Sequence, residues 1–308
     1  MLCLYKLKTT GLKMFVKDIL KQSIKLLKDG GIETPQLDAE VLLSYVLNKA
    51  RSQLYIYPDH VLNKDENSRY RALIDKRLEC MPICYLTGHK EFMSLDFNVN
   101  RNVLIPRPET ELLVETVCKF ISNTSLRPSQ EGNNAGGKVL DLGTGSGAIA
   151  VSLAKYNPNY LVLATDVSMG ALFVARENAV HNDVINRVLV IQTDLFYGIS
   201  PDNKFDWVVS NPPYIPTGDL PSLSEEIRKY EPILALDGGV DGLEVIKRII
   251  KNAFMFLKPS GHLAIEFGYG QSDDVQRIAE ETGKYSDYLI VNDYSEIQRF
   301  FCCKVKKW

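Results

Sequence analysis

The chain has 308 residues, with 36 lysines and arginines against 38 aspartates and glutamates, and its formal net charge is -2. This near balance excludes a general electrostatic attraction of the whole molecule to nucleic acid. Hydrophobic residues make up 45% of the chain and charged residues 24%, which excludes a disordered or fibrous protein. The length predicts two domains, one of ordinary size and one smaller.

Nothing at the N-terminus predicts export. Residues 1–13 lack the apolar core of a signal peptide, and no apolar run is long enough to span a bilayer. We therefore expect a cytoplasmic protein that makes no membrane contact. Met14 begins a clearer helical pattern than Met1 does, so we expect residues 1–13 to be a disordered or misassigned extension. The cysteines show no spacing typical of a disulfide framework, so we expect reduced thiols. The cysteines and histidines are not spaced as metal ligands, so we expect no metal site.

Helical periodicity dominates the first part of the chain. Apolar residues from Val16 onward follow helical spacing until Gly30 and Gly31 end the pattern. A second helix is predicted after Pro35, and a third over 70–78, before Pro82. The sequence therefore predicts a small helical domain over residues 14–83.

The following residues change to a period of two. Met93, Leu95, Phe97 and Val99 alternate with polar residues, which predicts a half-buried strand within a connecting β-hairpin over residues 84–100. Residues 106–111 then open a helix, with proline and acidic residues where a helix start favours them. Residues 122–137, rich in Ser, Asn and Gly, are expected to form an exposed loop.

From Lys138 onward, short apolar runs alternate with helical patterns, which predicts a βαβ series with a parallel sheet in residues 101–308. The predicted strands are Val139–Asp141, Leu161–Asp166, Val188–Gln192, Phe205–Ser210 and Leu263–Phe267, with closing strands at Tyr288–Val291 and Phe300–Val305. The predicted helices lie over Ile149–Ala154, Ala171–Val180 and Leu243–Phe256.

A glycine-rich stretch, Asp141–Gly147, lies where the first of these strands turns into the first helix. Glycines at such a turn let the backbone approach a ligand closely, and the helix N-terminus favours polar or anionic groups. The stretch also fits the looser dinucleotide fingerprint, so it leaves a nicotinamide cofactor and S-adenosylmethionine both open. The alternative is a tight turn without a ligand.

Two acidic residues end the next two strands. Asp166 is placed to accept hydrogen bonds from both ribose hydroxyls of an adenosyl cofactor. Its alternative is an N-cap for the following helix, although Ser168 is available for that task. Asp194, at the end of the third strand, is placed to reach an adenine amino group; its alternative is a simple turn residue.

Asn211–Tyr214, with the sequence Asn-Pro-Pro-Tyr, follows the fourth strand and separates the cofactor alternatives. Two successive prolines remove two backbone donors and leave carbonyl acceptors. A planar NH₂ group fits there, with one N–H bonded to the Asn211 side-chain oxygen, the other to the Pro212 carbonyl, and Tyr214 against its flat face. The segment therefore predicts methyl transfer to an amide or exocyclic amine, and its alternative is a proline-rich strand end.

The sequence resembles the HemK family, the peptide chain release factor glutamine methyltransferases, from about Met14 to the C-terminus. The stretches that carry the resemblance are Tyr85–Gly88, Glu91–Phe92, Val103–Pro108, Gly143–Gly147 and Asn211–Tyr214. Together these motifs are more specific than those of a generic methyltransferase.

The resemblance implies an α/β, Rossmann-like S-adenosylmethionine-dependent methyltransferase fold, with a mostly parallel seven-stranded sheet, in residues 101–308. It implies that the helical domain over 14–83 recognises the substrate. The implied reaction is N5-methylation of the glutamine amide in the Gly-Gly-Gln motif of release factors, in translation termination. S-adenosylmethionine is the implied cofactor and S-adenosylhomocysteine the product. We expect a monomer with no direct requirement for nucleic acid.

The family's functional residues carry over by position. The implied cofactor site comprises Gly143, Thr144, Gly145, Ser146, Gly147, Asp166, Asp194, Leu195 and Asn211. The implied catalytic site comprises Asn211, Pro212, Pro213 and Tyr214, with residues 106–108 nearby. The sequence departs from the family pattern at Leu195, where an aromatic is common, at Glu109, usually Asp, and at Ser94, usually Gly. Phe196 is an alternative source of the ring that would pack on adenine.

Four other functions remain open on the residues alone. An adenine-N6 DNA methyltransferase would use the same acceptors on a flipped base, but no second basic domain is evident. The residues alone do not exclude a ribosomal-protein glutamine methyltransferase, and only the family resemblance favours a release factor as the substrate. An NAD-dependent dehydrogenase or a non-catalytic binding module would share the glycine loop or the fold, and neither accounts for Asn211–Tyr214.

Overall fold

The computed structural model describes residues 14–123 and 136–306, so the expectations for residues 1–13 and for most of the loop at 122–137 lie outside the described residues. The chain divides between Thr87 and Gly88 into two compact units. Each unit is described by itself. No helix in the described part of the chain is long and apolar enough to cross a membrane.

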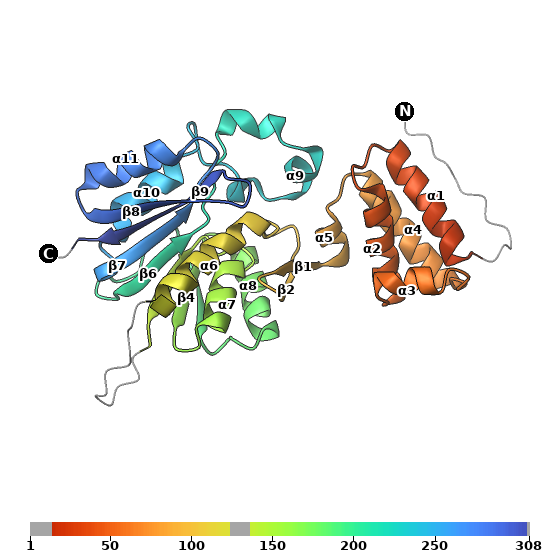
Figure 1. The fold of residues 1–308 in the computed structure, drawn as a ribbon, viewed down its shortest axis with the longest axis horizontal. Coiled ribbons are helices and arrows are strands. Elements are labelled where there is room, and N and C mark those ends of the chain that lie inside the picture. The colour runs from red at the N-terminus through yellow and green to blue at the C-terminus, as the bar shows by residue number, and fades with distance from the viewer. Residues whose placement is uncertain (1–13, 124–135, 307–308) are drawn as a thin grey trace. The chain divides into compact units, whose positions relative to one another are not determined.

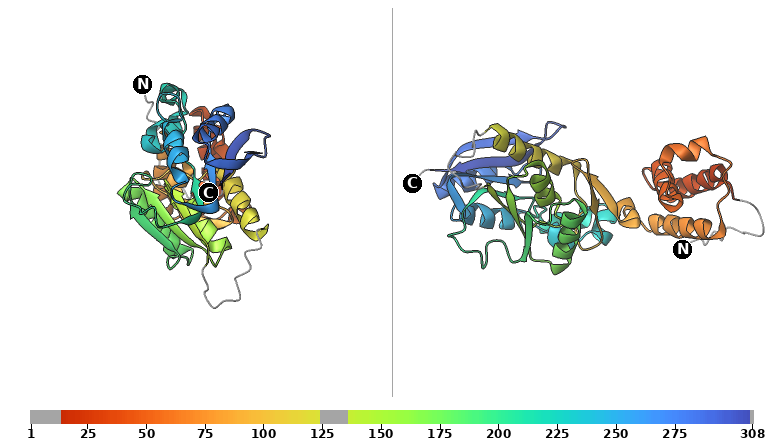
Figure 2. Two further views of the ribbon diagram at one scale, coloured as in Figure 1. Left: turned by 90° about the vertical axis from the view of Figure 1, so that its left-hand side faces the viewer. Right: turned by 90° about the horizontal axis from the view of Figure 1, so that it is seen from below.

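The first unit is a group of helices around an apolar core (Figure 2, right, red to orange). Its elements are α1 (Val16–Asp29), α2 (Pro35–Leu47), α3 (Arg51–Ile56), α4 (Lys64–Leu78) and α5 (Ile83–Thr87). Asn63 and Glu66 form a reciprocal capping box, which satisfies backbone donors at the start of α4. That cap explains why this helix begins six residues before the predicted one. The short α3 was not predicted.

The second unit opens with an antiparallel hairpin, β1 (His89–Phe92) and β2 (Leu95–Asn98). The prediction of one strand running from Met93 to Val99 was wrong at its start, because Met93 and Ser94 form the turn. Both residues have positive φ, 51° and 54°. A two-residue turn of this kind matches the twist of the strands, so the hairpin reverses within the predicted alternating run.

The seven-stranded sheet of the second unit has the order β5-β4-β3-β6-β7-β9-β8, and of these strands only β9 runs against the others (Figure 1). This arrangement confirms the mostly parallel Rossmann-like fold. The strands are β3 (Lys138–Leu142), β4 (Leu161–Asp166), β5 (Val188–Gln192), β6 (Phe205–Ser210), β7 (Leu257–Glu266), β8 (Tyr285–Asn292) and β9 (Gln298–Val305). The predicted ranges of β4, β5 and β6 are confirmed at both ends.

Helices cover both faces of the sheet (Figure 1). One face packs against α6 (Pro108–Asn123), α7 (Ala148–Tyr156) and α8 (Met169–His181), and the other against α10 (Glu244–Ala253) and α11 (Ser272–Thr282). Successive side chains of a strand point to opposite faces, so Val208 enters one core and Val209 the other. Such two-sided burial is why the strands are continuous apolar runs.

The connection from β6 to α10 is the longest in the described part of this unit. It contains η1 (Thr217–Ser222), α9 (Glu225–Tyr230) and η2 (Ile233–Ala235), none of which was predicted. The predicted helix at Leu243–Phe256 is shorter in the structure, and α11 was not predicted.

Candidate active site

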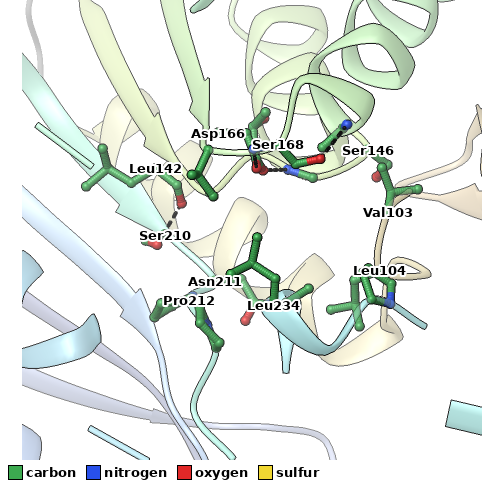
Figure 3. Close-up of a pocket in the computed structure, with 18 of the residues that line it drawn as sticks. Val103, Leu104, Leu142, Ser146, Asp166, Ser168, Ser210, Asn211, Pro212 and Leu234 are labelled. Carbon is green, nitrogen blue, oxygen red and sulfur yellow. Dashed lines mark hydrogen bonds between the residues drawn. The ribbon is translucent and has the colours of Figure 1, made fainter. Parts of the chain in front are cut away.

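A cavity of about 370 Å³ opens at the carboxyl ends of the central strands. The strand order reverses between β3 and β6, and an open parallel sheet forms its ligand crevice at such a point. The Ser210 hydroxyl donates to the Leu142 carbonyl at 2.8 Å, which ties the two strand ends together (Figure 3). The order of the strands thus places the cavity between the glycine-rich turn after β3 and the segment after β6.

The glycine-rich turn forms one wall of this cavity. Gly143 and Gly145 have φ of 69° and 55°, and a Cβ added to either would meet no atom within 4 Å. The backbone at these residues is therefore open to an approaching ligand. Gly147 differs from them, because it does not line the cavity and a Cβ there would lie 3.1 Å from Ala175. Its lack of a side chain lets the start of α7 pack closely on α8.

Asp166 lies at the end of β4 and lines the cavity (Figure 3). Its carboxylate accepts hydrogen bonds from the backbone N–H groups of Gly145 at 2.9 Å and Ser168 at 2.8 Å. Burial raises the pKa of Asp166, and these hydrogen bonds oppose the shift. The N-cap of α8 is Ser168, whose hydroxyl accepts from the Ala171 N–H at 3.2 Å. Asp166 therefore remains available to a ligand, with a further lone pair on each oxygen.

The three residues Asp194, Leu195 and Phe196, which follow β5, have different surroundings. Asp194 and Leu195 both line the cavity, but the Asp194 carboxylate is exposed and pairs with Arg248 at 2.7 Å. The Phe196 ring stacks on Phe256, with ring centroids 4.6 Å apart, and packs against the core beside α10. Leu195 is thus the residue of this pair at the cavity, and Phe196 is directed to the core.

The Asn-Pro-Pro-Tyr segment forms the opposite wall. Asn211, Pro212 and Pro213 line the cavity, and Figure 3 shows Asn211 and Pro212 across from Asp166. Tyr214 does not line it, and its hydroxyl donates to Oε1 of the buried Glu266 at 3.2 Å. Burial, together with the nearby Glu266 carboxylate, raises the pKa of the Tyr214 hydroxyl. The expectation that the Tyr214 ring lies against the flat face of the substrate finds no support in this placement.

Two polar residues that are linked to Asn211 by successive hydrogen bonds were missed by the sequence analysis. The Asn211 side-chain amide donates to Thr110 Oγ1 at 3.0 Å, and the Thr110 hydroxyl donates to Glu266 Oε2 at 2.7 Å. Burial raises the pKa of Glu266 to about 7, although its hydrogen bonds with Thr110 and Tyr214 oppose the shift. The available signal was an acidic residue inside the apolar run at 263–267, since buried strands rarely carry an unpaired charge.

The residues around α6 complete the wall of the cavity. Asn102, Val103, Leu104, Pro106, Arg107 and Thr110 line it, and from the β6–α10 connection so do Pro232, Leu234 and Ala235. The Arg107 guanidinium pairs with the buried Glu231 carboxylate at 2.6 Å and joins these two segments. Glu109, which departs from the family pattern, lies exposed in the first turn of α6.

The residues present fit an adenosyl cofactor. Asp166 offers acceptors to a pair of ribose hydroxyls, and Val167, Leu195 and Val245 give apolar surface for a base. Asp141, beneath the glycine-rich turn, is fully buried, and burial raises its pKa to about 7 while a hydrogen bond from Thr144 opposes the shift. Among the described residues, no group of three His, Cys, Asp or Glu side chains is arranged to hold a metal ion.

The fold and this cavity define a methyltransferase of the Rossmann-like class. A model described as "Methyltransferase small domain" matches residues 124–227, and one described as "PrmC N-terminal domain" matches residues 18–88. Among solved structures, the hMettl16 catalytic domain in complex with an RNA hairpin is 16% identical, with a TM-score of 0.55 over 81% of this chain and 85% of that one, which shows a shared fold alone.

Curated relatives resolve the class further. A release factor glutamine methyltransferase of Moorella thermoacetica is 41% identical, over 94% of this chain and 98% of the relative. Another, from Rhodopirellula baltica, is 37% identical, over 92% of this chain and 94% of the relative. A bifunctional methyltransferase of Rickettsia bellii is 38% identical, but the match covers 53% of its length. The chain belongs to the release factor glutamine methyltransferase family.

Proposed function

We propose that this protein transfers a methyl group from S-adenosylmethionine to the side-chain amide nitrogen of the glutamine in the Gly-Gly-Gln motif of release factors. The observation that carries the proposal is the position of Asn211 and Pro212 on one wall of the cavity, with Asp166 and the glycine-rich turn on the other. Acceptors for a planar NH₂ group thereby share one cavity with acceptors for a ribose.

The cofactor, when bound, supplies a methyl group on a positively charged sulfur. Asp166 would hold its ribose, the backbone at Gly143 and Gly145 would pass close beside it, and Leu195 would contact its base. Asp194 is paired with Arg248, so we assign it a smaller share of binding than Asp166. S-adenosylhomocysteine would remain after transfer.

An amide nitrogen is a poor nucleophile because its lone pair is delocalised into the carbonyl. The main help available is therefore to hold the nitrogen in line with the methyl group and to polarise both N–H bonds. The Asn211 side-chain oxygen and the Pro212 carbonyl would accept hydrogen bonds from the two N–H groups. Transfer would form the N–CH₃ bond as the bond between sulfur and the methyl group breaks, and the methylated nitrogen would then lose one proton to solvent, so no base would need to remove a proton before transfer.

The remaining assignments follow the same proposal. The helical unit would recognise the release factor, and the enzyme would act in the cytoplasm as a monomer without nucleic acid. The boundaries proposed for the helical domain, the connecting hairpin and the catalytic domain are 14–83, 84–100 and 101–308. Recognition of a protein by the helical unit agrees with the lack of net positive charge in the chain.

The test is a methylation assay with a recombinant release factor, a labelled methyl donor and mass mapping of the product. We expect one methyl group on the glutamine of the Gly-Gly-Gln motif and none after that glutamine is changed to alanine. Ribosomal proteins and adenine-containing DNA serve as competing substrates in parallel reactions. Methylation of either, with the release factor unmodified, would refute the proposed substrate.

A further inference from the structure

A chain of hydrogen bonds links the cavity to a buried carboxylate. It runs from Asn211, after β6, through Thr110 on α6 to Glu266 at the end of β7, over distances of 3.0 and 2.7 Å. Thr110 is 4% exposed and Glu266 is 1% exposed. The Tyr214 hydroxyl donates to the second oxygen of Glu266 at 3.2 Å. Three segments far apart in sequence thus meet behind one cavity residue.

The number of protons in this chain fixes its direction. An ionised carboxylate can only accept, so the single hydroxyl proton of Thr110 is directed to Glu266. Thr110 Oγ1 then has only lone pairs to offer Asn211, and the Asn211 amide must present its NH₂ group to Thr110. The amide oxygen is left on the opposite side of the side chain, toward the cavity. A reversed amide would set its oxygen against the Thr110 lone pairs.

We propose that Thr110 and Glu266 are positioning residues that hold the Asn211 amide with its oxygen directed at the substrate NH₂ group. This inference rests on the proposed function and adds two residues that do not touch the reacting atoms themselves. Without this hydrogen-bond chain, the two orientations of the Asn211 amide would be close in energy. The reversed orientation would face the substrate NH₂ group with another donor.

Ionisation of Glu266 controls the direction of the chain. The pKa of Glu266 is raised to about 7, chiefly by burial and also by Glu109 on α6, against the opposing effects of the Thr110 and Tyr214 hydroxyls and of Arg299 on β9. A protonated Glu266 can donate to Thr110, which frees the Thr110 proton to turn toward Asn211. The amide can then reverse, so turnover should fall as the pH drops below neutrality.

The first experiment compares Thr110→Val, which removes the hydroxyl at nearly constant shape, with Thr110→Ser, which keeps it. We expect Thr110→Val to lower kcat on the release factor about tenfold, as a lost orienting hydrogen bond implies, with S-adenosylmethionine affinity unchanged. Thr110→Ser should recover most of that loss. Thr116→Val makes the same change at another buried threonine of α6 and should leave kcat unchanged. Equal kcat for wild type and Thr110→Val, or equal losses in the valine and serine variants, would overturn the proposal.

The second experiment measures kcat against pH for wild type and Glu266→Gln. Wild type should lose turnover on the acid side of neutrality, and Glu266→Gln should show a lower kcat without that acid limb. An unchanged acid limb in Glu266→Gln would overturn the proposal. If the Thr110→Val protein does not fold, this pH measurement is the one that tests the proposal.

A wild-type enzyme that leaves release factors unmethylated would refute the proposed function, and the hydrogen-bond chain would then be tested by NMR of the Asn211 side chain. Contacts between its NH₂ protons and the Thr110 methyl group support the orientation. Their absence overturns it.

Discussion

The side chain of Asn211 connects the cavity to buried polar groups. Its NH₂ group is held by Thr110, and Asn211 itself lines the cavity beside Pro212. Asp166 serves the opposite wall in a comparable way, because two backbone N–H groups fix its carboxylate. At the scale of single residues, each wall thus presents a polar side chain whose orientation is set by hydrogen bonds to neighbouring protein groups.

Replacing Asn211 should separate turnover from cofactor binding. Asn211→Ala removes an acceptor that faces the substrate, so we expect kcat to fall about 100-fold, the typical loss for one oriented polar group. The affinity for S-adenosylmethionine should remain nearly that of the wild type. Single-turnover kinetics and isothermal calorimetry measure the two quantities, and loss of cofactor binding in this variant would contradict the assignment.

Replacing Asp166 should mainly weaken cofactor binding, in contrast to the replacement of Asn211. Asp166→Ala removes the acceptor for the ribose hydroxyls, and we expect S-adenosylmethionine binding to weaken by about 1 to 3 kcal/mol. Asp194→Ala is the matched control, because that carboxylate is exposed and paired with Arg248. Calorimetry should show the smaller loss for the Asp194 variant. Equal losses in both variants would contradict the distinction that the structure draws between these two carboxylates.

At the scale of elements, the hairpin of β1 and β2 depends on a strained turn. Met93 and Ser94 both have φ in the left-handed region, which is unfavourable for residues other than glycine, asparagine and aspartate. The family resemblance led us to expect glycine at Ser94. Serine thus replaces glycine at a position where glycine has a conformational advantage.

Ser94→Gly should therefore stabilise the protein by roughly 0.5 to 1 kcal/mol, because glycine adopts positive φ without steric cost. Ser122→Gly is the matched control, since Ser122 lies in the last turn of α6, where glycine should destabilise the helix. Urea denaturation measures both free energies of unfolding. A stability loss in Ser94→Gly would show that a contact of the serine side chain outweighs the turn geometry.

At the scale of the whole molecule, the carboxyl groups of Asp141 and Glu266 are buried in the catalytic unit. Burial raises the pKa values of Asp141 and Glu266 to about 7 each. A carboxyl group with a raised pKa contributes most to stability below its unfolded pKa, and that contribution is lost as the pH rises through the folded value. Both groups therefore lower the stability of the fold on the alkaline side of neutrality.

Asp141→Asn tests this dependence. At pH 5 the buried aspartate is protonated and neutral, so the difference in melting temperature between the two proteins at that pH is the reference. At pH 8 the wild type must bury a charge, and the variant should gain roughly 3 kcal/mol relative to it. Scanning calorimetry of both proteins without cofactor at the two pH values measures the effect. A difference in melting temperature that does not grow with pH would contradict it.

Local patterns predicted the central strands and the two motifs that face the cavity. β4, β5 and β6 were predicted at both ends because each contains a run of apolar residues, although β5 at the edge of the sheet is exposed over much of its length. The glycine-rich turn and Asn211–Tyr214 each lie within a few residues, so their spacing is visible in one dimension. The turn at Met93 and Ser94 was missed because two-residue hairpin turns of this kind favour Asn-Gly, Asp-Gly or Gly-Gly, and the pair Met-Ser does not give that signal.

The sequence by itself determined the class of fold and the family, and it singled out the glycine-rich turn and the Asn-Pro-Pro-Tyr segment, because each depends on a short contiguous pattern. Only the tertiary structure decided that Tyr214 is directed inward, that Asp194 pairs with Arg248, and that Thr110 stands between Asn211 and Glu266. Thr110 and Glu266 are 156 positions apart. Their hydrogen bond exists because α6 packs over β7, and Asn211 can join it because the sheet order brings β6 beside β7. No periodicity in the chain encodes such a contact.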